Sequence, residues 1–158
     1  MRDWDEPADT QTRIAWPEGW APDVERFRSG IDLSSDELLP GELDLIRDWY
    51  RSTYGDVPAH VEFLGATAPD VLKTYRARYE TTVRGALPAQ MIPLLALHLY
   101  AVTLAPKPVR RAVQLARALG VSRREVVTVL LWAAVYGGDA ALETAFEAVD
   151  LTMFTELK

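Results

Sequence analysis

Glycine and proline divide the C-terminal half of the chain into helical segments, and this pattern restricts the fold more than any other feature of the sequence. Apolar runs with helical spacing stop at Gly120 and again at Gly137-Gly138. Ser122 and Glu125 form an S-x-x-E capping box directly before the run that follows Gly120. The pattern therefore predicts a helix that ends near residue 119, a second that begins at the capping box, and a third that begins after Asp139.

The preceding residues predict further helices, each bounded by proline or glycine. An amphipathic stripe begins at Pro40, and the next segments open with a proline in or before the first turn. The run Ala105-Pro106-Lys107-Pro108 must end the most apolar segment, because two prolines remove backbone donors. No strand-like alternation persists, so we expect an all-α protein of about seven helices. The upstream helices are expected at 40–55, 56–65, 69–85 and 88–105.

The N-terminal 35 residues differ from the rest of the chain. They are polar and contain three prolines, and no helical period holds beyond two turns. We expect an extended arm over residues 1–35 and a single helical domain over residues 36–158. Trp4, Trp16 and Trp20 lie in this arm. Two interpretations remain open: the aromatic side chains pack on the body or on a neighbouring subunit, or the arm recognises a partner.

The order and spacing of four segments resemble the carboxymuconolactone decarboxylase family, which includes the alkylhydroperoxidase D-like proteins. The segments are a lead-in helix, a short turn, the capping-box start and the closing helices, at 69–84, 86–88, 120–125 and 134–146. The resemblance implies an alkylhydroperoxidase D-like helical bundle. It also implies a homo-oligomer, a trimer or a hexamer, since relatives in this family assemble in that way.

The chain departs from the family at the catalytic positions. The redox branch works through a Cys-x-x-Cys pair, and the resemblance places those cysteines at Ala105 and Pro108. The family histidine falls on Ala112, and the relay glutamate falls near Pro93. The chain has no cysteine, so thiol peroxidase chemistry is excluded. The decarboxylase branch, which needs no cofactor, is weakened but stays possible.

Composition excludes several other classes of protein. The net charge of −6 argues against binding to nucleic acid, and two histidines without cysteine argue against a metal site. The apolar stretch 87–105 contains Gln90, Pro93 and His98, so we interpret it as a buried helix and expect no membrane partner. The first 20 residues lack the apolar core of a signal peptide, and we therefore expect a cytoplasmic protein.

Candidate site residues follow from the types of side chain in the apolar helices. His98 is the only residue between 91 and 104 whose side chain ordinarily gains or loses a proton near neutral pH, which makes it a candidate acid or base. Tyr136 is a candidate hydrogen-bond donor, Trp132 a pocket wall, and Lys107 and Arg111 candidate contacts for a substrate carboxylate. Each also has a structural interpretation, as a core histidine, an aromatic packing residue or a solvated cation.

Other polar residues are better explained by local structure. Glu125 and Asp139 are interpreted as helix caps, and His60 and Glu62 as surface residues. Two functions remain open. The first is a non-redox, cofactor-free enzyme that acts on a small organic acid, lactone or carbonyl compound by decarboxylation, elimination or proton transfer. The second is a catalytically silent member that binds a ligand or assembles with itself or with an active paralogue.

Overall fold

The computed structural model describes residues 16–83, 87–149, 153 and 157, and the part of the chain that it describes is helical, without strands. The all-α prediction is confirmed. The elements are the 3₁₀ turn η1 (Glu25–Phe27) and the helices α1 (Glu42–Tyr54), α2 (Ala59–Thr67), α3 (Pro69–Thr82), α4 (Met91–Val102), α5 (Pro106–Ala118) and α6 (Arg123–Ala148).

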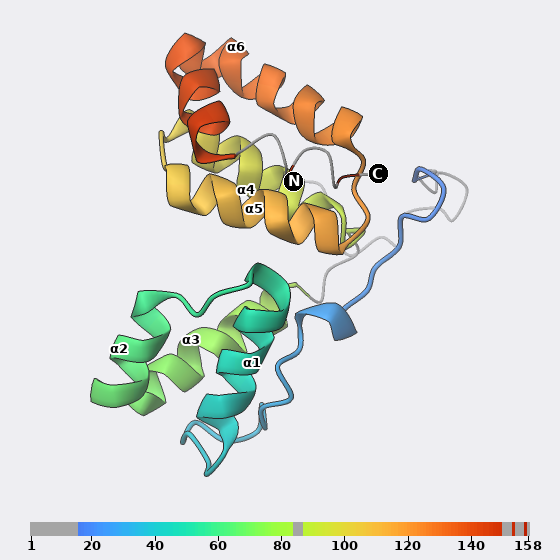
Figure 1. Cartoon of the computed structure of the whole chain (residues 1–158). Helices are drawn as coiled ribbons and strands as arrows, with labels where there is room; N and C mark the ends of the chain where they lie inside the picture. The colour runs from blue at the N-terminus through green and yellow to red at the C-terminus, as the bar shows by residue number, and fades with distance from the viewer. Residues whose placement is uncertain (1–15, 84–86, 150–152, 154–156, 158) are drawn as a thin grey trace, which may run out of the picture.

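The helices form two groups, α1–α3 and α4–α6, which lie one above the other in Figure 1. Each group has its own apolar cluster. Ile46, Val61 and Leu72 lie in the first cluster, and Leu97 and Leu130 lie in the second. The groups meet where α1 packs against α5, and Leu115 of α5 belongs to the cluster of the α1–α3 group.

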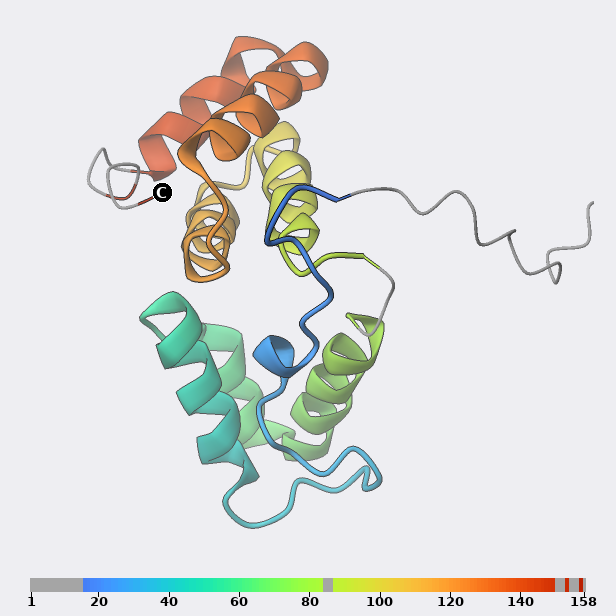
Figure 2. The ribbon, with the colours of Figure 1, turned by 90° about the vertical axis from the view of Figure 1, so that its right-hand side faces the viewer.

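Residues 16–41 run along both groups (Figure 2). Trp20 packs against the α4–α6 cluster, and the backbone N–H of Ala89 donates to the carbonyl of Ala21 over 3.0 Å. Phe27 is buried in the cluster of the α1–α3 group. This part of the predicted arm is therefore packed on the body, whereas Trp4 lies outside the described residues.

Several helix boundaries follow the predicted punctuation. Helix α3 begins at Pro69, and the capping box before α6 is confirmed: Glu125 N–H donates to Ser122 Oγ over 3.3 Å, and Ser122 N–H donates to Glu125 Oε2 over 2.7 Å. The predicted stop at Gly85 lies outside the described residues.

The predicted end of α2 at Gly65 is wrong, because α2 continues to Thr67. Gly65 has a packing role instead. A Cβ atom at this position would lie 2.7 Å from Leu43 of α1. The glycine leaves room for the Leu43 side chain, which the pattern of residues within α2 alone does not reveal.

Helix α6 is bent at the predicted Gly-Gly break. Gly138 has φ 67° and ψ −166°, although the helical assignment continues through it. By length and composition α6 is apolar enough to cross a membrane, and 22% of its most apolar window is buried within the described part of the chain. The 15 residues before the break would span about 22 Å, less than the ~30 Å hydrocarbon layer of a bilayer. Gly138 thus divides α6 into two helical segments.

Candidate functional site

A cavity of about 320 Å³ lies between the two helical groups. Five of the six tyrosines of the chain line it, together with Trp49 and His60. Apart from Arg111, its remaining wall is apolar and includes Ile92 and Ala96 of α4 and Ala112 and Leu115 of α5. We call this space the aromatic cavity; its tyrosines are Tyr50, Tyr54, Tyr75, Tyr79 and Tyr100.

The inner phenols of the aromatic cavity stay protonated at neutral pH. Burial raises the pKa of Tyr79 to about 12, although the nearby Arg76 guanidinium opposes the shift. Burial also raises the pKa of Tyr54 well above its usual range, and that of Tyr50 to a smaller degree. These hydroxyl groups therefore keep their protons, although Tyr54 and Tyr79 share a hydrogen bond, which leaves one of their two protons for a ligand.

His60 stands at the outer part of the cavity, in the first turn of α2. Its ring meets Tyr75 edge to face at 5.7 Å between centroids, and Tyr50 at 6.2 Å. Partial burial lowers the pKa of His60, and the positive charge of Arg111 lowers it further. At pH 7 the imidazole is neutral and has a basic nitrogen.

Arg111 is the cation of the aromatic cavity, and it also lines a second, more open cavity of about 610 Å³. We call this second space the basic vestibule. Lys107 and Arg110 of α5 line the basic vestibule as well, so the structure brings together the two cations that the sequence proposed as carboxylate contacts. Arg111 pairs with Asp56 over 3.2 Å, and the Asp56 side chain is well exposed.

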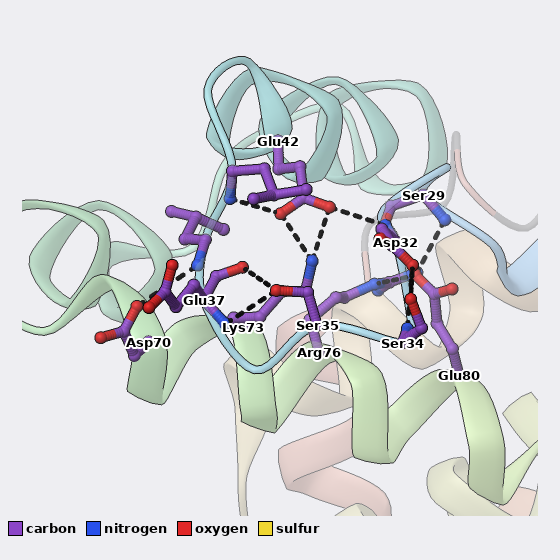
Figure 3. A network of polar contacts seen from close by, with 12 residues as sticks. Ser29, Asp32, Ser34, Ser35, Glu37, Glu42, Asp70, Lys73, Arg76 and Glu80 are labelled. Atoms are coloured by element: carbon purple, nitrogen blue, oxygen red, sulfur yellow. Dashed lines mark hydrogen bonds and ion pairs between the residues drawn. The ribbon is translucent and has the colours of Figure 1, made fainter.

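A buried ionic network supports the aromatic wall from the α3 side (Figure 3). The Arg76 guanidinium lies 3.7 Å from the centroid of the Trp49 ring, and it pairs with Glu80 over 2.8 Å. Arg76 Nη2 donates to the carbonyl of Phe27, whereas its Nη1 is buried without a hydrogen-bond partner among the described residues. The carboxylate of Glu80 accepts from the N–H and the hydroxyl of Ser29 over 2.9 and 2.6 Å. The network thus fixes residues 27–29 and Trp49 on α3.

A second buried pair lies one turn earlier on α3. Lys73 Nζ lies 2.5 and 2.6 Å from the two carboxylate oxygens of Glu42. Glu42 also accepts from the N–H groups of Asp32 and Leu39 over 2.6 and 2.8 Å. Burial opposes ionisation of Glu42, but the hydrogen bonds from Lys73 and from these backbone groups outweigh it and lower its pKa. The pair anchors the chain before α1 to α3.

The residues predicted as catalytic lie elsewhere. His98 of α4 and Tyr136 of α6 do meet, edge to face at 5.6 Å. However, Tyr136 is 69% exposed and Trp132 is 56% exposed, and the lining of the aromatic cavity includes none of these three residues. The roles given to His98, Tyr136 and Trp132 stay predictions.

Sequence reasoning missed His60 and the five tyrosines. His60 was interpreted as a surface residue, and its side chain is indeed exposed, but it also lines the cavity. The tyrosines come from α1, α3 and α4 and meet only through packing between helices. The spacing of the tyrosines along the chain does not indicate which of them converge.

The described residues also include the positions to which the resemblance assigns the family's catalytic groups. Pro108 and Ala112 line the aromatic cavity, and Ala105 directly precedes α5. Pro93 is buried in α4. Within the described ranges, no three His, Cys, Asp or Glu side chains are grouped so that they could hold a metal ion. Two of these positions therefore line the aromatic cavity, and its polar groups come from other residues.

Comparison with known families agrees with the resemblance seen in the sequence. The model of the carboxymuconolactone decarboxylase family matches residues 69–151, just over half of the chain, from the start of α3 to beyond α6. No curated protein and no solved structure matches the chain. The chain therefore belongs to the carboxymuconolactone decarboxylase family.

Proposed function

We propose that the protein is a non-redox, cofactor-free enzyme that acts on a small organic acid, lactone or carbonyl compound within the aromatic cavity. One observation supports this most strongly. The cavity is lined by Pro108 and Ala112, two positions to which the resemblance assigns catalytic groups of the family, and its cation, imidazole and protonated phenols come from other positions. Such a set of convergent polar groups in a largely apolar cleft is typical of a small-molecule site.

Each group in the cavity has a defined task in this proposal. Arg111 holds the substrate carboxylate, since its partner Asp56 is exposed and the existing pair is weak. Neutral His60 takes a proton from the carbon next to the substrate carbonyl. The electron pair of that C–H bond then forms the enolate, whose oxygen accepts a hydrogen bond from a phenol such as Tyr54 or Tyr79. Return of the proton to another carbon, or loss of a leaving group, completes an isomerisation or an elimination.

Decarboxylation is the related alternative within the same site. Here the bond to the carboxylate carbon breaks, CO₂ leaves, and the electron pair forms the same enolate, which is then protonated on carbon. In this alternative the carboxylate lies on the dry floor of Trp49, Tyr50, Ala112 and Leu115 rather than at Arg111, because its removal from water favours loss of the charge.

The two histidines of the chain provide a matched test. Turnover is measured by ¹H NMR in D₂O with a panel of keto acids and lactones, which reports proton exchange and decarboxylation together. We expect His60→Gln to abolish turnover and His98→Gln to leave it intact, because glutamine can form hydrogen bonds but cannot act as a base near neutral pH. Circular dichroism checks that both variants are folded.

The reverse outcome, loss of turnover only in His98→Gln, would return the catalytic role to His98 and Tyr136. Such a result would place the chemistry on the outer face of α4 and α6 and would reject the aromatic cavity as the active site.

A silent ligand-binding or scaffold member is the second candidate function. The observation that favours it is that Pro108 and Ala112 stand where the family keeps its catalytic groups. In that case the cavity binds a small molecule without converting it, and the whole panel gives neither exchange nor decarboxylation.

We further propose that the protein assembles as a homo-oligomer, a trimer or a hexamer. Apolar side chains of α4 and of the part of α6 before Gly138 that are more than half exposed support this: Leu95, Leu99, Leu131, Trp132, Val135 and Tyr136. We call this set the apolar surface. A second copy of the chain that covers it would remove these side chains from water.

A further inference from the structure

We propose that the ligand of the aromatic cavity is a carboxylic acid that bears a planar aromatic ring, with the ring in the aromatic cavity and the carboxylate at Arg111, where the basic vestibule begins. The inference rests on the proposed function for the location of the site. It goes further by naming the class of ligand. Three features carry it: the composition of the cavity wall, the charge of the vestibule and the connection between the two spaces.

The wall of the aromatic cavity suits a flat ring. Trp49 and Tyr50 form part of its floor and are almost completely buried, at 8% and 9% exposure. Most ring pairs around them are set edge to face, such as Trp49 and Tyr79 at 5.9 Å and an interplanar angle of 63°, whereas Tyr50 and Tyr54 are stacked at 5.8 Å. A ligand ring can continue this arrangement, in which the positive edge of one ring meets the negative face of another.

The size of the cavity agrees with a single substituted ring. An engineered apolar cavity of about 150 Å³ accommodates benzene, and the aromatic cavity has about 320 Å³. The additional space is sufficient for a short side chain on the ring. It is too small for a ligand with several extended groups.

The basic vestibule suits an anion. Lys107, Arg110 and Arg111 line it, and Asp56 is the one acidic residue among the described residues of its lining, although the whole chain has a net charge of −6. The first turns of α2 and α5 also face this region, since Ala59 and Lys107 both line it. The positive ends of two helix dipoles therefore add to the charge of the side chains.

Arg111 and Tyr54 line both spaces and thus define the junction. A guanidinium can bind a carboxylate through two parallel hydrogen bonds. The Tyr54 hydroxyl, whose pKa is raised by burial, can donate a third. A ring in the aromatic cavity would direct its carboxylate toward these two groups, which explains why the cation stands beside the phenols.

The test uses three probes of similar length that differ in one property each. We would titrate the full-length protein by calorimetry with 3-phenylpropanoate, 3-cyclohexylpropanoate and 3-phenylpropan-1-ol. We expect the aryl acid to bind about tenfold more tightly than either of the others, because only it has both the flat ring and the charge. Equal affinity for the cyclohexyl acid would overturn the aromatic part of the proposal, and equal affinity for the alcohol would overturn the anionic part.

Variants locate the carboxylate. Arg111→Gln should weaken binding of 3-phenylpropanoate about tenfold and leave binding of 3-phenylpropan-1-ol nearly unchanged. Arg110→Gln, which alters only the vestibule, should have a smaller effect on the acid. Arg51→Gln removes an exposed charge from α1 outside both spaces and serves as the control. A loss of the same size in Arg51→Gln and Arg111→Gln would show that only the overall charge matters, which would overturn the assignment.

The proposed function and the ligand class fail in different ways. Turnover of a lactone or keto acid without an aromatic ring, together with no binding of 3-phenylpropanoate, would reject the ligand class and retain the enzyme. Tight binding of 3-phenylpropanoate that depends on Arg111, with no turnover of any compound in the panel, would retain the ligand class and reject the enzyme.

Discussion

Two cations of α3, Lys73 and Arg76, are completely removed from solvent. Each has a carboxylate partner, Glu42 or Glu80, and each partner also accepts backbone hydrogen bonds from the segment that precedes α1. A buried ion pair of this kind contributes little net stability over apolar residues of the same shape, but loss of one partner leaves an uncompensated charge. The pairs therefore specify where residues 27–42 lie on α3.

Replacement of Lys73 by methionine tests this interpretation. Lys73→Met should lower the free energy of unfolding by about 3–5 kcal/mol, because the Glu42 carboxylate stays buried without its cation. The double variant Glu42→Met with Lys73→Met should recover a large part of the loss, since neither charge remains. Urea unfolding followed by circular dichroism measures both.

The exposed pair Arg47–Glu62 is the control for this prediction. Its atoms also approach to 2.6 Å, but both side chains are partly exposed. Arg47→Met should therefore cost less than about 1 kcal/mol. A cost equal to that of Lys73→Met would contradict the argument from burial.

At the scale of helices, hydrogen bonds between neighbouring residues determine where α6 begins, and the backbone conformation of one residue determines where it bends. The capping box satisfies the first free N–H groups of α6, and Gly138 then turns the backbone out of the helical range within the same element. Its φ of 67° and ψ of −166° fall in a region that only glycine occupies readily. The direction of the last three turns of α6 depends on this residue.

Asparagine substitutions at two glycines test the role of this conformation. Gly138→Asn should lower the free energy of unfolding by about 1–3 kcal/mol, because asparagine cannot adopt the required ψ without strain. Gly55, the C-cap of α1, has φ 80° and ψ −12°, a left-handed conformation that asparagine tolerates.

Among the described residues, no atom lies within 4 Å of a Cβ atom added at either glycine. A steric clash therefore cannot explain a difference in stability between the two variants. Gly55→Asn should therefore change the urea midpoint only slightly. If both variants lose the same stability, the difference in ψ has no energetic consequence and the argument fails.

At the scale of the whole molecule, the apolar surface on α4 and α6 consists of six apolar side chains that are more than half exposed. Apolar side chains gathered in this way are typical of an interface between subunits. The apolar surface lies in the half of the chain that the family model matches, away from the lining of the aromatic cavity. Burial of this surface against other copies would also cover the pair formed by His98 and Tyr136. Those two residues would then have a part in assembly.

Light scattering tests the assembly. The purified protein at micromolar concentration should give the mass of a trimer or a hexamer, and Val135→Glu should reduce that mass, because it places a charge on a valine that is 71% exposed in the apolar surface. Val71→Glu is the control, since Val71 is an exposed valine of α3 in the other helical group. A monomeric mass for the unmodified protein would reject the proposal.

The sequence by itself determined the helical class, most helix boundaries and the family. These features depend on interactions within a few residues: the proline at the start of α3, the stop at Gly120 and the reciprocal hydrogen bonds of Ser122 and Glu125. The matched family segment also begins at Pro69, where the resemblance begins. The absence of cysteine excluded the thiol chemistry directly.

Only the tertiary structure decided which side chains share a site. Lys73 reaches Glu42 across 31 positions, and Arg111 reaches Asp56 across 55. Helical periodicity shows which face of a helix is apolar, but it contains no information about which other helix will cover that face. For this reason the sequence pointed to His98 within an apolar helix, whereas packing of α2 against the other elements placed His60 beside Arg111 and the tyrosines.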